Sequence, residues 1–191
     1  MFIDLHTHID QYEPEELPGM LARAYEAEVG VVVASGVTVE STRRCLELAH
    51  EFEGVFAGVG VHPSDLTGDL EQGELDQLRQ MATDDSVVVM SEVGLDHQDH
   101  SPDRAVQERA FRAQLGIAHE VDLPVVFHMR EATADMLRVL REERVSELGG
   151  AAHYFQGSHE EASAVIDLGC YISLAKPLLR LPELQEVARA L

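Results

Sequence analysis

Two histidines separated by one residue, His6 and His8, close a short apolar run at the start of the chain. Residues i and i+2 of a strand point to the same side, so both imidazoles can bind one metal ion. A His-x-His pair alone is weak evidence for such a site. Three further residues of metal-binding type, Glu92, His128 and His153, stand at the ends of later apolar runs or within them. Together the five residues predict a metal site.

Short apolar runs alternate with longer amphipathic segments along the chain, and this alternation must position those side chains. We expect strands at residues 2–6, 30–35, 55–61, 87–92, 124–129, 151–155 and 170–174. We expect helices at residues 15–27, 39–51, 73–81, 101–121, 132–145, 160–168 and 182–190. This spacing is typical of repeated βα units, and continuously apolar strands suit a parallel sheet covered on both faces. The pattern predicts an α/β fold, either a (β/α) barrel or a doubly wound sheet.

In a (β/α) barrel the carboxyl ends of all strands meet at one face, where the active site lies. The candidate ligands would therefore converge, and His62, which follows the third strand, would join them. No glycine-rich phosphate loop follows the first strand, which argues against a dinucleotide-binding sheet. The sequence therefore favours the barrel.

Each candidate ligand also has an ordinary structural interpretation. His128 follows three apolar residues and could be a hydrogen-bonded core histidine, His153 could be a satisfied interior group, and Glu92 could cap a turn. The metal interpretation is favoured because all of them occupy equivalent positions at strand ends. Four other histidines fall in helical or loop segments, where we assign them to solvent or ordinary packing: His50, His100, His119 and His159.

Composition narrows the class of protein. The chain has 191 residues with a net charge of −21, and 45% of its residues are hydrophobic, so it is read as one globular domain. No apolar run approaches ~18 residues, which argues against a membrane protein. The acidic balance argues against a broad nucleic-acid-binding surface. Cys45 and Cys170 do not make a disulfide framework, and with no signal-peptide pattern we expect a cytoplasmic protein.

Several segments match the motifs of one family in order. Residues 2–10 (FIDLHTHID), 60–63 (GVHP), 91–96 (SEVGLD), 124–132 (PVVFHMREA) and 153–157 (HYFQG) carry the match, with Gln107 and Gln114 on the helix after the fourth strand. In these segments the chain resembles the TatD family of metal-dependent hydrolases, within the amidohydrolase superfamily. The resemblance covers essentially the whole chain.

The resemblance implies a (β/α)8 TIM-barrel type of fold and a divalent-metal-dependent deoxyribonuclease. It implies that His6 and His8 hold a first ion, that His128 and His153 hold a second, and that Glu92 bridges both and takes part in catalysis. Zn, Mn or Mg are the candidate ions; imidazole ligands favour the first two, whereas the family is often described with Mg.

The resemblance also implies how a substrate is bound and cleaved. His62 and Arg130 would contact a substrate phosphate, and a metal-activated water would attack the phosphodiester. Because the surface is acidic, we expect a small site that takes DNA ends or oligonucleotides.

The chain departs from the family pattern in three places. It offers about seven βα units, and the acidic motif of an eighth strand is not found, so residues 1–191 are read as one barrel domain that is incomplete at its C-terminus. Open sheet edges would then favour self-association. His97 stands where the family more often has an aromatic residue, and Tyr154 where it more often has a small one. Two alternatives stay open: another superfamily hydrolase acting on amides, lactones or phosphoesters, or a catalytically inactive, truncated metal-binding barrel.

Overall fold

The computed structural model describes all residues 1–191, with seven parallel strands in one sheet whose spatial order follows the chain. The strands are β1 (Phe2–Thr7), β2 (Val29–Ser35), β3 (Val55–Val59), β4 (Val87–Asp96), β5 (Val125–Arg130), β6 (Gly150–His153) and β7 (Cys170–Ile172). The helices are α1 (Leu17–Glu26), α2 (Val39–Glu51), α3 (Gln72–Ala82), α4 (Arg104–Val121), α5 (Thr133–Glu142), α6 (His159–Ile166) and α7 (Pro182–Ala190). Four short 3-10 turns lie between them.

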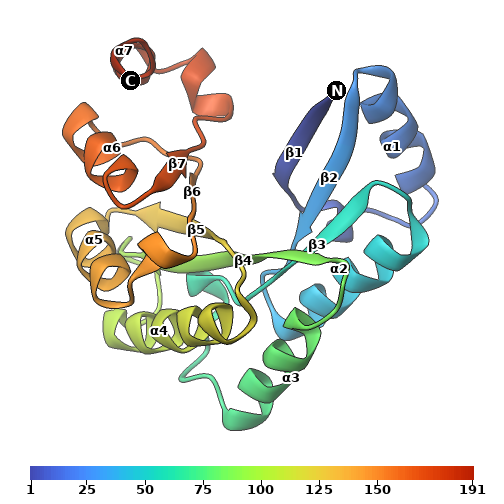
Figure 1. The fold of residues 1–191 in the computed structure, drawn as a ribbon, viewed down its shortest axis with the longest axis horizontal. Helices are drawn as coiled ribbons and strands as arrows, with labels where there is room; N and C mark the ends of the chain where they lie inside the picture. The colour runs from blue at the N-terminus through green and yellow to red at the C-terminus, as the bar shows by residue number, and fades with distance from the viewer.

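The sheet is strongly curled and the helices lie on its outer side (Figure 1). Strands β3, β4 and β5 cross the middle of the view, while β1 with β2 and β6 with β7 lie on opposite sides of it. The edges of the sheet are β1 and β7, which do not pair with each other. This is the βα-repeat architecture of a TIM-type barrel, with seven strands, and it confirms the predicted fold class.

Both faces of the sheet are apolar, which explains the continuous apolar runs in the sequence. Consecutive residues of a strand point to opposite faces. Thus Val125 and Phe127 of β5 belong to the large core cluster of 38 buried residues, whereas Val126 between them packs in a second cluster. That smaller cluster draws one residue from each of four strands: Val33, Val89, Val126 and Ala151.

Two element boundaries differ from the sequence prediction near the candidate site. We expected β4 to end at Glu92, which is wrong: the strand continues to Asp96, which pairs with Arg130 of β5. We expected the following helix to begin near Ser101, but α4 begins at Arg104 with the Asp103 carboxylate as its N-cap. Ser101 is instead drawn to β4, where its hydroxyl donates a hydrogen bond to Asp96.

Two other expectations from composition can be compared with the structure. Cys45 and Cys170 are both buried and free, so they form no disulfide. None of the helices combines the length and the apolar character needed to cross a lipid bilayer.

Candidate metal centre

The predicted site residues come together at the carboxyl ends of the strands. His6 lies in β1 with His8 just beyond it, His62 follows β3, Glu92 lies in β4, His128 in β5, and His153 ends β6. In a curled parallel sheet these positions face one another across the mouth of the barrel.

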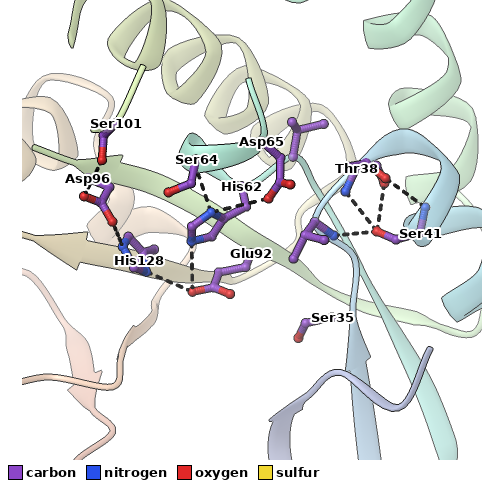
Figure 2. A network of polar contacts seen from close by, with 12 residues as sticks. Ser35, Thr38, Ser41, His62, Ser64, Asp65, Glu92, Asp96, Ser101 and His128 are labelled. Atoms are coloured by element: carbon purple, nitrogen blue, oxygen red, sulfur yellow. Dashed lines mark hydrogen bonds and ion pairs between the residues drawn. The ribbon is translucent and has the colours of Figure 1, made fainter. Parts of the chain in front are cut away.

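Glu92 lies at the centre of the cluster and is only 4% exposed. Its Oε2 atom lies 3.1 Å from His6 Nε2 and 3.6 Å from His8 Nε2. Its Oε1 atom lies 3.1 Å from His128 Nδ1 and 3.7 Å from His62 Nε2 (Figure 2). The two carboxylate oxygens therefore face two different pairs of imidazoles, which is the arrangement a bridging carboxylate needs.

The ligand atoms fall into two groups, and Glu92 belongs to both. One group is His6, Glu92 and His153, the other is His62, Glu92 and His128, and the ligand atoms within each lie within 4.8 Å of one another. His8 is in neither group, whereas His62 is in the second. The assignment of individual histidines to two ions, with His62 kept for substrate, stays a prediction.

His153 closes the first group across the mouth of the barrel. Its ring stacks on that of His6, with centroids 3.6 Å apart and an interplanar angle of 22°. Its Nδ1 atom is buried and has no hydrogen-bond partner. Buried polar atoms are normally paired, so an unpaired ring nitrogen beside a buried carboxylate fits a group whose natural partner is a cation.

Neighbouring polar groups fix the orientation of the first two histidines. His6 Nδ1 lies 3.1 Å from the hydroxyl of Ser35 and 3.2 Å from that of Ser91. His8 Nδ1 lies 3.3 Å from the carbonyl oxygen of Ser35. With Nδ1 occupied in this way, the Nε2 atoms of both rings are aimed at Glu92, as in metal sites where an outer partner orients the imidazole.

Asp96 orients the His128 ring in the same way, and the sequence analysis did not identify Asp96 as a site residue. Its Oδ2 atom accepts a hydrogen bond of 2.9 Å from His128 Nε2 (Figure 2). Its Oδ1 atom accepts hydrogen bonds from the backbone N–H of Gln98 and from the Ser101 hydroxyl. Asp96 is four residues after Glu92, so both fall on the same side of a continuous strand. That spacing is a usable signal once β4 is known to extend past Glu92.

Two buried glutamines of α4 hold the backbone that carries these residues. The Gln114 side chain accepts a hydrogen bond of 2.7 Å from the Val61 N–H and donates one to the Val61 carbonyl oxygen. These two bonds fix the backbone just before His62. Gln107 does the same for the N–H and carbonyl groups of Asp96. These contacts give both glutamines of the helix motif a positioning role.

The charge states of His62, His153 and Glu92 suit metal binding, whereas His128 is held by its two carboxylate partners. Burial lowers the pKa of His62 and of His153 to about 4, so both are neutral at pH 7 and have a lone pair to offer. Burial alone would raise the pKa of Glu92, but hydrogen bonds with His128 and His6 outweigh it and hold that pKa well below its usual range. Burial alone would lower the pKa of His128, but its contacts with Glu92 and Asp96 outweigh it and raise that pKa.

A cavity of about 720 Å³ opens beside the cluster. His8, His62, Glu92, His128 and His153 reach its wall, and the exposed Arg130 lines it as well. The volume lies within the range of roughly 300–1,000 Å³ that is usual for ligand sites. The cavity therefore joins the ligand cluster to a cationic side chain suited to a phosphate.

Comparison with known proteins agrees with the site geometry. The family described as TatD related DNase matches residues 3–191. A Bacillus subtilis relative named uncharacterized metal-dependent hydrolase YabD is 33% identical over 181 residues, which covers 93% of this chain and 70% of that protein. The Salmonella typhimurium protein named 3'-5' ssDNA/RNA exonuclease TatD is 32% identical over 155 residues, which covers 81% of this chain and 59% of that protein.

A solved structure shows the same fold. The TatD homologue YJJV from Escherichia coli K12 has a TM-score of 0.91 and 29% sequence identity, covering 100% of this chain and 74% of that chain. The chain thus spans between 59% and 74% of the length of these relatives. The resemblance inferred from the motifs, and with it the expected class of metal-dependent hydrolase, is confirmed. By family match, relatives and fold, the chain belongs to the TatD related DNase family.

Proposed function

We propose that the cluster around Glu92 is the two-metal centre of a phosphodiesterase that acts on DNA ends or oligonucleotides. The observation that carries this proposal is the position of Glu92, whose two oxygens lie 3.1 Å from His6 and His128 on opposite sides. His6, His8, His128 and His153 would complete the ligand set, with Zn, Mn or Mg as the ions. When bound, such ions acidify water and stabilise charge on the phosphodiester oxygens.

The chain's own residues would bind and orient the substrate. Arg130 would donate hydrogen bonds to a non-bridging phosphate oxygen, for which its planar guanidinium is suited. His62, whose pKa is lowered by burial, would act as a neutral donor at the same phosphate: its Nδ1 atom accepts the Ser64 N–H, which leaves the proton on Nε2. Glu92 stays ionised and so keeps negative charge between the two ligand groups.

The name of the Salmonella typhimurium relative supports a single-stranded substrate, cleaved from its 3' end. A site confined to one cavity is consistent with this, because a strand end needs few phosphate contacts. On this proposal, the ordinary substrate is a short single strand of DNA or RNA.

The test combines metal analysis with cleavage of a labelled oligonucleotide. The wild-type chain is expected to bind two Mn²⁺ or Zn²⁺ ions and to shorten a 5'-labelled single strand stepwise. Glu92→Gln keeps the side-chain size, removes the charge, and is expected to lose both binding and cleavage. Glu131→Gln is the matched control, because Glu131 lines the same cavity but forms no hydrogen bond or ion pair with the histidines of the cluster. A wild-type chain that binds no divalent ion would overturn the proposal.

A further inference from the structure

One aromatic side chain in the cavity is not used by the metal centre. Tyr154 directly follows His153 and lines the cavity together with Arg130. It is 43% exposed, although large aromatic side chains usually gain stability by burial. Its nearest aromatic neighbour is the His153 ring, whose centroid lies 5.8 Å away at a tilt of 47°. Packing within the chain therefore leaves much of the ring free.

The backbone at Tyr154 adopts a conformation that aromatic residues rarely accept. Its φ is +51°, in the left-handed region that favours glycine. Such outliers persist where the surrounding structure enforces them, and they cluster at functional sites. Here Phe155, the next residue, is buried, and its N–H bonds to the Ser173 carbonyl, which fixes the chain on one side of Tyr154. On the other side His153 pairs with His128 of β5, so the backbone that carries the ring is held at the cavity wall.

The cavity wall is otherwise mostly polar and would suit the phosphate and sugar of a nucleotide. A nucleobase needs something else, because its binding energy comes largely from stacking on an aromatic face. Stacking also requires an unpaired base, which a single-strand end provides. The placement of Tyr154 beside His153, and of Arg130 on the same cavity, puts a stacking surface and a phosphate-binding group in one site.

We propose that Tyr154 is the stacking platform for the terminal nucleobase of a single-stranded nucleic acid and gives the site its preference for nucleotides over phosphodiesters that lack a base. This inference rests on the proposed function and specifies its substrate contact. The ring binds by its face, so the hydroxyl group is dispensable. The platform tolerates any base, because every base has a π face.

Two variants remove the ring and one keeps it. Tyr154→Phe keeps the aromatic face, Tyr154→Ala removes it, and Tyr154→Gly removes it while suiting the φ of +51°. Tyr25→Ala is the matched control, since Tyr25 is an exposed tyrosine on α1 outside the cavity. Thermal unfolding of each variant verifies that the fold is kept.

Binding is measured with a single strand that ends in 2-aminopurine, whose fluorescence is quenched by stacking. Cleavage is measured on that strand and on one ending in an abasic nucleotide. We expect the Ala and Gly variants to raise Kd and KM for the base-bearing end roughly tenfold, with little change for the abasic end. The Phe variant and Tyr25→Ala should match the wild type.

The two substrates separate this inference from the proposed function. Wild-type cleavage of the abasic end reports on hydrolysis alone, whereas the ratio of base-bearing to abasic KM reports on Tyr154. If that ratio is the same in Tyr154→Ala and Tyr154→Gly as in the wild type, the proposed stacking on Tyr154 is wrong, while the proposed hydrolysis stands. If the wild type cleaves neither end, the proposed hydrolysis is wrong. The 2-aminopurine quenching then decides the platform by itself.

Discussion

Gly94 controls how closely β4 and β5 approach at the metal centre. It lies between Glu92 and Asp96 with a φ of +141°, and a Cβ placed there would meet the His128 carbonyl oxygen at 2.1 Å. Ordinary van der Waals contact begins near 3.4 Å, so the strands would have to move apart by about 1.3 Å. The contact between Glu92 Oε1 and His128 Nδ1, now 3.1 Å, would no longer be a hydrogen bond after such a shift.

We therefore expect Gly94→Ala to lower the free energy of unfolding by about 3 kcal/mol, from overpacking of ~1–3 kcal/mol plus a backbone penalty of ~1–2 kcal/mol. Urea unfolding measures this change, and calorimetric titration with Mn²⁺ measures the accompanying loss of metal affinity. Gly116→Ala in α4 is the control, because nothing lies within 4 Å of its added Cβ. That substitution should stabilise the helix by roughly 0.5–1 kcal/mol.

Gly150, the first residue of β6, offers a second comparison, because it pairs with Val125 at the start of β5. A Cβ there would meet the Val125 carbonyl oxygen at 2.0 Å, with a φ of +155°, so Gly150→Ala should be about as destabilising as Gly94→Ala. The larger loss of Mn²⁺ affinity should belong to Gly94→Ala, which lies between the ligands. A Gly94→Ala protein with the wild-type urea midpoint and the wild-type Mn²⁺ affinity would refute this reasoning.

Three further predictions concern the ligands and the sheet edge. Asp96→Asn removes the negative charge beside His128 Nε2 and leaves one acceptor oxygen for the partners that now share two. This should weaken Mn²⁺ binding ~10–100-fold, as calorimetry would show; unchanged affinity would exclude that role. The unfolded chain binds more protons than the folded one between pH 6.5 and 4, because His62 and His153 have folded-state pKa values of about 4. The free energy of unfolding of the metal-free protein, measured in urea, should thus fall as the pH falls through this window. The raised pKa of His128 opposes this loss only in part. A free energy that does not change with pH would contradict the lowered pKa values of His62 and His153. Ile3, 63% exposed on edge strand β1, favours edge-to-edge pairing, so Ile3→Lys should reduce self-association in sedimentation experiments; an unchanged distribution would argue against that edge.

Apolar runs predicted the strands well because a parallel sheet with two covered faces requires them. The run at 124–129 contains Val125, Val126 and Phe127, which pack into clusters on both faces of the sheet. Candidate ligands directly after or within such runs, such as His128 and His153, therefore had to lie near one end of the sheet. For these two histidines the sequence therefore predicted both the strand that carries them and their place near its carboxyl end.

The extent of β4 was not predictable in the same way. A glycine and an acidic residue after Glu92 are typical of a strand that has ended. The strand continues because Gly94 fits against β5 and because the buried Gln107 side chain bonds both backbone groups of Asp96. These are tertiary contacts between segments far apart in the sequence, so local pattern could not predict them, and Asp96 was missed.

Which ligands lie close together depends on the curvature of the sheet, which local sequence also does not predict. His6 on β1 and His153 on β6 belong to strands with four others between them in the sheet, yet their rings stack with centroids 3.6 Å apart. Only the curl of the sheet brings them together. Sequence spacing groups His6 with His8, which are neighbours in the chain, and gives no measure of that curl.

The strongly acidic surface limits how this chain could hold a nucleic acid. Seven of the thirteen arginines form ion pairs with carboxylates, which leaves six arginines and Lys176 to contact a phosphate backbone. Arg130 is one of the six and is exposed on the cavity wall. If contact is confined to this cavity, only about one or two phosphates are neutralised, and log K should fall with log salt with a slope near −1. A slope of about −4 or steeper would show that the strand follows a longer path over the surface, and the argument for a site-limited substrate would fail.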